Sequence, residues 1–167
     1  LAPRALWWFR WGAMFTFITG LYLLYSIGAH SNLMGAPIIW IGSIAGILMF
    51  LNVWLIIWPN QQVVLGMKEG DGPASAAKAG LASRTNTLFS GPMLFGMLGS
   101  QHLSVLWGSG ESAIYAAKLN PAAIWICLGI IAALEVNALF GKTGPMTTVK
   151  GVIHCSLALT VTLWAIL

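Results

Sequence analysis

The residues of this chain best suited to cofactor chemistry are its three histidines. His30 and His102 are predicted to lie on different membrane helices, both near the outer face. Two imidazoles at one depth can hold a haem iron between them. Haem b is therefore the candidate cofactor, with His102 and His30 as its candidate axial ligands. The alternative is a pair of interfacial histidines that bond to water or to loop carbonyls.

A second group of polar residues is predicted at membrane depth, where polar side chains are costly and are functional candidates by default. Its members are Arg10, Asn52, Asn86, Glu135 and His154. At 1.5 Å per residue, Glu135 and His154 lie roughly 6 to 8 Å from the cytoplasmic ends of neighbouring helices. We therefore expect Glu135 to contact His154 or Arg10. This buried polar layer could act as a proton relay or support a cofactor ligand; the alternative is a polar clamp between helices.

The cysteines and the placement of the histidines exclude several classes of site. Cys127 and Cys155 stand alone inside apolar runs, without a Cys-x-x-Cys or Cys-x-x-Cys-His motif. Their context excludes a disulfide framework, a zinc ribbon and a covalently attached haem. His154 is predicted at the face opposite the other two histidines, so no metal site is expected. The sequence identifies no catalytic residue.

The composition indicates that the chain is a membrane protein, so membrane helices must position these side chains. Of the 167 residues, 58% are hydrophobic and 7% are charged, against roughly 25% charged residues in a soluble domain. The mean hydropathy is +0.83. These values exclude an ordinary soluble protein and a disordered one. The eight basic residues are scattered and form no run that could follow a phosphate backbone, so no nucleic-acid partner is expected.

Five apolar stretches are long enough to cross a bilayer, which takes about 20 residues. They cover residues 7–28, 37–58, 85–107, 121–140 and 151–167. The predicted fold is therefore all-α, a single integral membrane helical bundle over residues 1–167. Pro92 is expected to kink the third span, and Asp71, Gly72 and Pro73 predict the start of a short surface helix over residues 74–81. Because the chain begins at Leu1, we expect that upstream residues are missing.

The basic residues predict the orientation of the bundle. With five spans, seven of the eight fall on the side of the N-terminus: Arg4, Arg10, Lys68, Lys78, Arg84, Lys142 and Lys150. Only Lys118 falls on the other side. The positive-inside rule then places the N-terminus in the cytoplasm, in a multi-pass protein of the bacterial inner membrane.

Small and aromatic residues predict how the helices meet. Gly42 and Gly46 form a Gly-x-x-x-Gly pair, and Gly129 with Ala133 forms a similar pair; both would let helix backbones approach closely. The aromatic residues of the spans, Tyr22 among them, could line a pigment or quinone pocket. Lipid contact or helix packing is the alternative for such residues.

Three segments of the chain resemble the membrane domain of urate hydroxylases, the family called urate oxidase N-terminal. They are WFRWGAMFTFITG (residues 8–20), FLNVWLIIWPNQQVVLG (50–66) and SRTNTLFSGPMLFGMLGSQH (83–102). The residues that carry the resemblance are Asn52, Pro59, Asn60, Gln61, Arg84, Asn86, Pro92 and His102. In that family the bundle is larger, and a cytochrome c domain that accepts electrons usually follows it. Gly12 stands where the resembled stretch has an acidic residue.

The resemblance implies redox or urate-related chemistry, and two functions follow from it. The first is a subunit or domain of a membrane oxidoreductase or electron-transfer complex, with haem b as cofactor. Its expected partners are the lipid bilayer, other membrane subunits and a cytochrome c. The second is a non-catalytic subunit that scaffolds a larger energy-converting membrane complex. The sequence leaves open whether the chain is itself an enzyme.

Overall fold

The computed structural model describes residues 2–26, 37–106 and 121–167. The described residues form helices only: α1 (Ala2–Ser26), α2 (Pro37–Leu51), the π-helix η2 (Asn52–Ile57), α3 (Trp58–Val64), α4 (Gly72–Leu106), α6 (Pro121–Phe140), the 3-10 helix η3 (Gly144–Thr147) and α7 (Val149–Ile166). This part of the chain contains no strand. The prediction of an all-α fold is confirmed.

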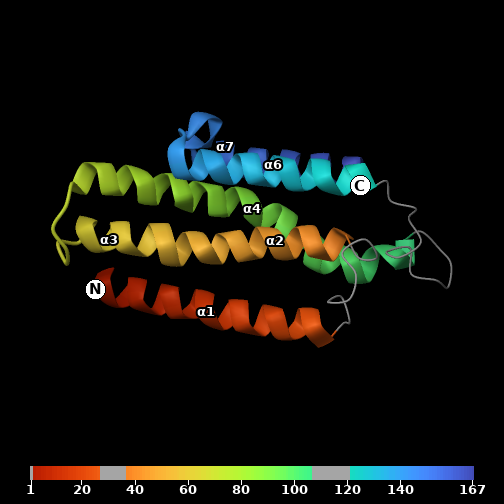
Figure 1. Ribbon diagram of the computed structural model, residues 1–167, viewed down its shortest axis with the longest axis horizontal. Coiled ribbons are helices and arrows are strands. Elements are labelled where there is room, and N and C mark those ends of the chain that lie inside the picture. Colours follow the sequence, from red (N-terminus) through yellow and green to blue (C-terminus); the bar gives the residue numbers. More distant parts are fainter. Residues whose placement is uncertain (1, 27–36, 107–120) are drawn as a thin grey trace.

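The long helices run side by side along one axis (Figure 1). Helix α1 lies at one edge of the bundle, next to the continuous rod formed by α2, η2 and α3. Helix α4 follows, and α6 and α7 lie at the other edge. The N-terminus, the loop between α3 and α4, and the η3 segment lie toward one end of the bundle, which we call the basic end because Lys68, Lys78, Lys142 and Lys150 fall there.

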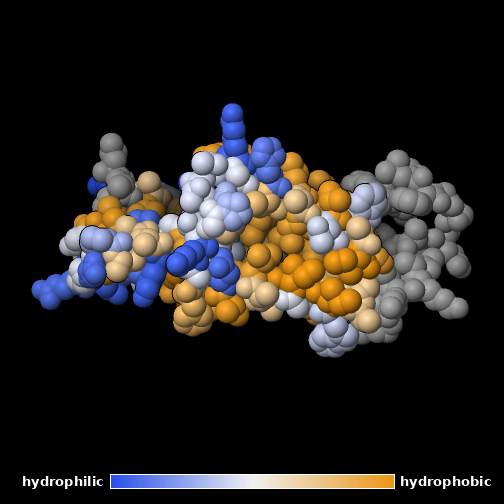
Figure 2. Space-filling view, turned by 90° about the horizontal axis from the view of Figure 1, so that it is seen from above, coloured by the Kyte–Doolittle hydropathy of each residue, from blue (hydrophilic) through white to orange (hydrophobic). Residues whose placement is uncertain are grey.

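Three helices of the described residues are long and apolar enough to cross a membrane: 37–64, 122–140 and 149–166. They correspond to the second, fourth and fifth predicted spans. Helix α1 carries Arg4 and Arg10, and α4 is rich in Ser, Thr and Gly, so neither reaches the same apolarity. The space-filling view shows a hydrophobic middle, with hydrophilic residues gathered toward the basic end (Figure 2). The structure thus supports a membrane protein with three described helices that could span a bilayer.

The helices extend further toward the basic end than the predicted spans do. The second span was predicted to end at residue 58, whereas its helix continues to Val64. The predicted short helix over residues 74–81 and the predicted span over 85–107 form one helix, α4. The Asp71 carboxylate accepts a hydrogen bond from the Ala74 N–H at 3.1 Å and caps this helix. Hydrogen bonding along the backbone carries both helices beyond their apolar segments.

Pro92 lies inside α4 without ending it. A proline in a helix removes one backbone donor, so neighbouring groups must stabilise the interruption. The preceding residue, Gly91, donates its backbone N–H to the Ser156 hydroxyl of α7 at 3.1 Å. A side chain at Gly91 would collide with this hydroxyl. The absence of a side chain at Gly91 therefore allows α7 to reach the backbone of α4.

The main core lies where α2, α4, α6 and α7 meet. Its buried members include Ala45, Phe89, Ile131 and Leu159, one from each of these helices. Gly42 of α2 and Gly96 of α4 meet backbone to backbone, since a Cβ atom built at Gly96 would lie 2.7 Å from the Gly42 Cα. Gly42 of the predicted Gly-x-x-x-Gly pair thus mediates a close helix contact. Gly129 of the other pair has open space around it.

Helix α1 packs more loosely than the others. It touches the bundle through a few side chains, of which Ala13 joins a small cluster with Val53 and Ile57. Phe17 stacks on Phe50 with ring centroids 4.1 Å apart. Much of its remaining surface is exposed, including 70% of Trp8. This loose packing leaves room between α1 and the rest of the bundle.

Candidate functional site

Three of the polar residues predicted at membrane depth meet inside the bundle. The Asn52 side-chain NH₂ donates to the Asn86 carbonyl oxygen at 3.0 Å and to the Glu135 carboxylate at 3.2 Å. The Asn86 NH₂ in turn donates to the backbone carbonyl of Met49 at 3.0 Å. These side chains come from η2, α4 and α6, so the polar triad of Asn52, Asn86 and Glu135 joins three helices.

The backbone carbonyl of Met49 sets the direction of every hydrogen bond in the polar triad. Since a carbonyl only accepts, Asn86 must present its NH₂ to Met49 and its oxygen to Asn52. Asn52 must then direct its NH₂ toward Glu135. The carboxylate is therefore an acceptor in this arrangement, and the ionised form of Glu135 is compatible with it.

Asn52 is the most buried member of the polar triad, with 1% of its surface exposed. Its carbonyl oxygen has no hydrogen-bond partner in the described structure, although buried polar atoms are almost always paired. Asn52 is also the first residue of the π-helix η2, and π-helical turns are frequent at functional sites. Both features single out Asn52 as the centre of the candidate site.

Arg10, the fourth predicted member, binds aromatic rings instead of Glu135. Its guanidinium lies 4.1 Å from the ring centroid of Trp58, 4.9 Å from that of Trp54 and 5.6 Å from that of Trp11. A guanidinium over an indole face is attracted by the negative face of the ring. Arg10 thereby ties α1 to the α2–η2–α3 rod near the basic end.

The histidines do not join the polar triad in the described structure. His154 is exposed on α7 and makes no hydrogen bond or ion pair with a described residue, so the expected contact with Glu135 is not formed. His102 belongs to the last turns of α4, but its side chain lies outside the described residues, and so does the whole of His30. The part of the chain with described side chains holds no group of three metal-binding residues.

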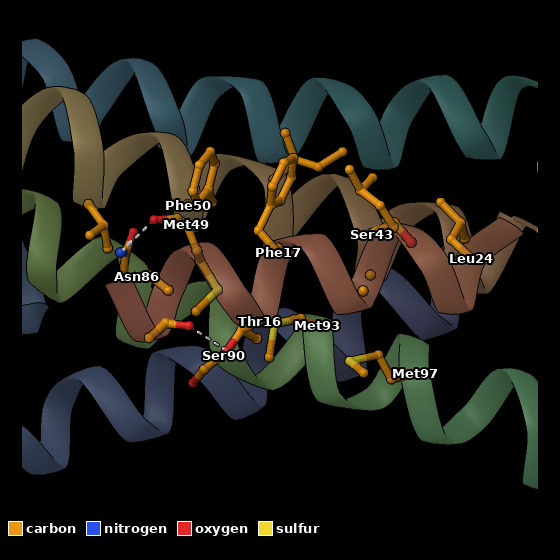
Figure 3. Close-up of a pocket in the computed structure, with 18 of the residues that line it drawn as sticks. Thr16, Phe17, Leu24, Ser43, Met49, Phe50, Asn86, Ser90, Met93 and Met97 are labelled. Atoms are coloured by element: carbon orange, nitrogen blue, oxygen red, sulfur yellow. Dashed lines mark hydrogen bonds between the residues drawn. The ribbon is translucent and has the colours of Figure 1, made fainter. Parts of the chain in front are cut away.

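A cavity of about 910 Å³ lies beside the polar triad, between α1, α2, η2 and α4. Asn86 lies toward one end of it and Leu24 toward the other (Figure 3). Most of the lining is apolar, with Phe17, Phe50 and three methionines prominent in the view. Because Asn86 belongs both to the cavity wall and to the polar triad, a ligand in the cavity would lie two hydrogen bonds from Glu135.

The sequence analysis predicted a pocket lined by aromatic residues of the spans but did not predict its position, for which the sequence contained a signal. Six of the cavity's lining residues follow a three- or four-residue spacing along α4: Ser83, Asn86, Ser90, Met93, Met97 and Ser100. Such a row of small, hydroxyl or flexible residues lies on one helix face. Of the aromatic residues predicted to line a pocket, Phe9, Phe17 and Phe50 line the cavity, whereas Tyr22 is 69% exposed and does not.

Comparison with known proteins identifies the family. A family profile described as urate oxidase N-terminal matches residues 28–133. The match includes two of the three resembling segments, 50–66 and 83–102, and two members of the polar triad, Asn52 and Asn86. No curated protein and no solved structure matches the chain. Since the profile covers more than half of the 167 residues, the chain belongs to the urate oxidase N-terminal family.

Proposed function

We propose that this chain is a membrane domain of an oxidoreductase or electron-transfer complex, and that the polar triad handles the proton that accompanies electron transfer. The observation that carries the proposal is the position of Glu135, the titratable member of the polar triad, which Asn52 links by two hydrogen bonds to Asn86 in the cavity wall. Family membership supports redox chemistry. The domain would lie in the bacterial inner membrane with its N-terminus in the cytoplasm.

An acidic side chain inside a membrane bundle suits this role. Moving an electron into an apolar medium is costly unless a positive charge follows it, because the low dielectric leaves the charge unscreened. A carboxylate at this depth can take up and release a proton, and such residues often form proton relays in membrane proteins. Glu135 is half-buried and receives its hydrogen bond from an amide whose direction is set by Met49.

The cofactor of the proposed oxidoreductase is haem b, with His102 and His30 as the proposed ligands and a cytochrome c as the proposed electron partner. A haem would supply one-electron chemistry. Among the described side chains, His154 alone offers an imidazole, and it is exposed and does not line the cavity. The described residues thus supply no axial pair by themselves, and the haem proposal depends on His102 and His30.

The proposal is tested by activity and by spectroscopy on the full chain in its native complex. Because the family is named for urate oxidation, urate is the substrate to use, with added cytochrome c as acceptor. We expect Glu135→Gln to lower the rate at least tenfold. Glu69→Gln is the matched control, because it makes the same change in an exposed loop. Equal rates for the two variants would refute the role of the polar triad.

The haem is tested separately by difference spectra of the reduced and oxidised complex. We expect a Soret band that is lost in His102→Ala and kept in His154→Ala. A band that survives in His102→Ala would assign the haem to another ligand or another subunit.

A second function, the scaffold subunit, is supported by the outer faces of α6 and α7. Large apolar residues are exposed there, including 62% of Trp125 and 85% of Phe140. Such a face fits lipid or neighbouring membrane subunits. A complex without a Soret band, without urate-dependent turnover and with other chains co-purifying would favour this function.

A further inference from the structure

The cavity runs lengthwise along the helices. Its lining on α4 runs from Ser83 to Ser100, which is about 25 Å at the α-helical rise. On α4, Ser83, Asn86, Thr87 and Ser90 lie in the half nearer the basic end, and the other half is lined mainly by apolar residues such as Leu21 and Leu24, with Ser43 and Ser100 as its polar members. This shape fits a molecule with a polar head and a long apolar tail.

Five of the six hydroxyl groups of the lining share one property, which is that their protons already form hydrogen bonds; the sixth, Ser83, forms none with a described residue. Each of the five donates to a backbone carbonyl of its own helix: Thr16 to Gly12 at 2.9 Å, Ser43 to Ile39 at 2.7 Å, Thr87 to Ser83 at 3.2 Å, Ser90 to Thr87 at 2.7 Å and Ser100 to Met97 at 3.1 Å. Serine and threonine in helices commonly bond in this way. What these hydroxyls still offer to a ligand is their oxygen lone pairs.

The cavity wall therefore offers more hydrogen-bond acceptors than donors. A ligand with only acceptors could accept from the Ser83 hydroxyl, but any further bond to a lining hydroxyl would require an existing hydroxyl–carbonyl bond to break, and unpaired polar groups in an apolar site are costly. A ligand with O–H groups could bond to the hydroxyl oxygens as they are. An acyl chain of a lipid has no hydrogen-bond donor. A helix of a neighbouring protein uses its backbone donors within itself. Neither occupant would bond to the hydroxyl oxygens of the cavity wall.

The walls also favour an aromatic head. Phe17 and Phe50 stack nearly parallel, with 6° between their planes, and both line the cavity. The thioethers of Met49, Met93 and Met97 lie in the same lining (Figure 3). Methionine sulfur makes favourable contacts with aromatic rings and adapts to ligands of irregular shape.

We infer that the cavity binds a lipid-soluble hydroquinone, with its hydroxylated ring near Asn86 and Ser90 and its apolar tail toward Leu24. A part for this ligand in the proposed redox reaction would rest on the proposed function, but its binding depends only on the cavity. The inference includes no electron-transfer step.

The test compares three probes with the same ten-carbon tail: a hydroquinone, its di-O-methyl ether, which keeps the aromatic ring without donors, and the corresponding quinone, which has neither donors nor an aromatic ring. Binding to the full chain in lipid nanodiscs is measured and corrected for partition into nanodiscs without protein. We expect the hydroquinone to bind at least tenfold more tightly than the quinone and the ether. Equal affinities for all three probes, or no binding above the protein-free nanodiscs, would overturn the inference.

Two glycine variants test the location. A Cβ atom at Gly20 or at Gly129 meets nothing within 4 Å, but only Gly20 lines the cavity. We expect Gly20→Leu to weaken hydroquinone binding at least tenfold and Gly129→Leu to leave it unchanged. An unchanged affinity in Gly20→Leu would place the ligand elsewhere and refute the site.

These outcomes are separable from those of the proposed function. Hydroquinone binding that survives Glu135→Gln while urate turnover is lost would support both. Selective hydroquinone binding in a protein without a Soret band or turnover would support the binding site and contradict the oxidoreductase. Turnover and a Soret band without selective hydroquinone binding would contradict the inference alone.

Discussion

Helix α4 and helix α1 both pack against the α2–η2–α3 rod, but they do so in opposite ways. At the α4 contact, Gly42 and Gly96 bring the backbones so close that no further atom fits between them. At the α1 contact, aromatic rings hold the helix at a distance, through the Phe17–Phe50 stack and the Arg10–Trp58 contact. The space that remains beside α1 is the cavity.

The difference shows how a membrane bundle can combine rigidity with a binding site. In lipid, association of helices depends on close packing and interhelical hydrogen bonds, and the α4 contact supplies the packing. The polar triad adds hydrogen bonds between the same rod, α4 and α6. Helix α1 contributes little to this core and is therefore free to enclose a ligand. Four substitutions test this difference between the tightly packed α4 contact and the looser α1 contact.

The largest effect is expected from Gly96→Ala. The new Cβ atom would lie 2.7 Å from the Gly42 Cα and 2.8 Å from the Ile38 carbonyl oxygen, and backbone atoms cannot move aside as side chains can. We expect the free energy of unfolding, measured by SDS titration in mixed micelles, to fall by about 3 kcal/mol. A variant as stable as the parent would show that the two helices can separate without loss.

Asn52→Ala should have the next largest effect. It removes a fully buried amide and leaves Asn86 and Glu135 without their shared donor, at a cost of about 2 kcal/mol. The control is Asn60→Ala, because Asn60 is half-buried and bonds only to the Ile56 carbonyl of its own helix. If both variants lost the same stability in the SDS titration, the polar triad would contribute nothing of its own.

Arg10→Gln is expected to act on α1 alone. Loss of the cation–π contacts with Trp54 and Trp58 should lower stability by about 1 kcal/mol. Amide hydrogen exchange should become faster in α1 and stay unchanged in the core of α4. Arg4→Gln, at an exposed position of the same helix, should change neither quantity, and faster exchange throughout the bundle would contradict the view of α1 as a separate element.

The smallest effect, and one of opposite sign, is expected from Gly20→Ala. A Cβ atom there meets nothing within 4 Å, and alanine favours the helix over glycine by about 0.5 to 1 kcal/mol. The SDS titration should therefore show an increase in stability of about 0.5 kcal/mol. A loss comparable to that of Gly96→Ala would mean that α1 packs as tightly as α4.

The sequence predicted the helices well and their ends poorly. The apolar runs over residues 37–58, 121–140 and 151–167 lie in the three helices that can cross a membrane. Their hydrophobicity is a local property, so it can be read without knowledge of the neighbours. The ends near Val64 and Gly72 lie in polar sequence, where capping by Asp71 and continued backbone bonding decide the boundary.

The members of the site were predicted better than their contacts. Asn52, Asn86 and Glu135 stood out because polar residues at membrane depth are rare. Their depth could be estimated from helix position, but the direction in which each side chain points could not. His154 therefore shared a predicted depth with Glu135 and yet lies exposed on α7. The cavity depends on how far α1 stands from the bundle, which no local pattern encodes.

The π-helix η2 affects the directions in which the two halves of the α2–η2–α3 rod face around its axis. Each residue of an α-helix advances the chain by about 100° around the axis, and a π-helical turn takes up one more residue than an α-helical turn. The segment before η2 carries Gly42, which faces α4, and the segment after it carries Trp58, which faces Arg10. If the same residues, Asn52–Ile57, were wound as a regular α-helix, these two faces would be rotated apart by about 100°, whereas deletion of one residue that restored the α-helix would keep their relative direction. The wide turn thus accommodates one extra residue and keeps the contact with α4 and the contact with α1 on their observed sides of the rod.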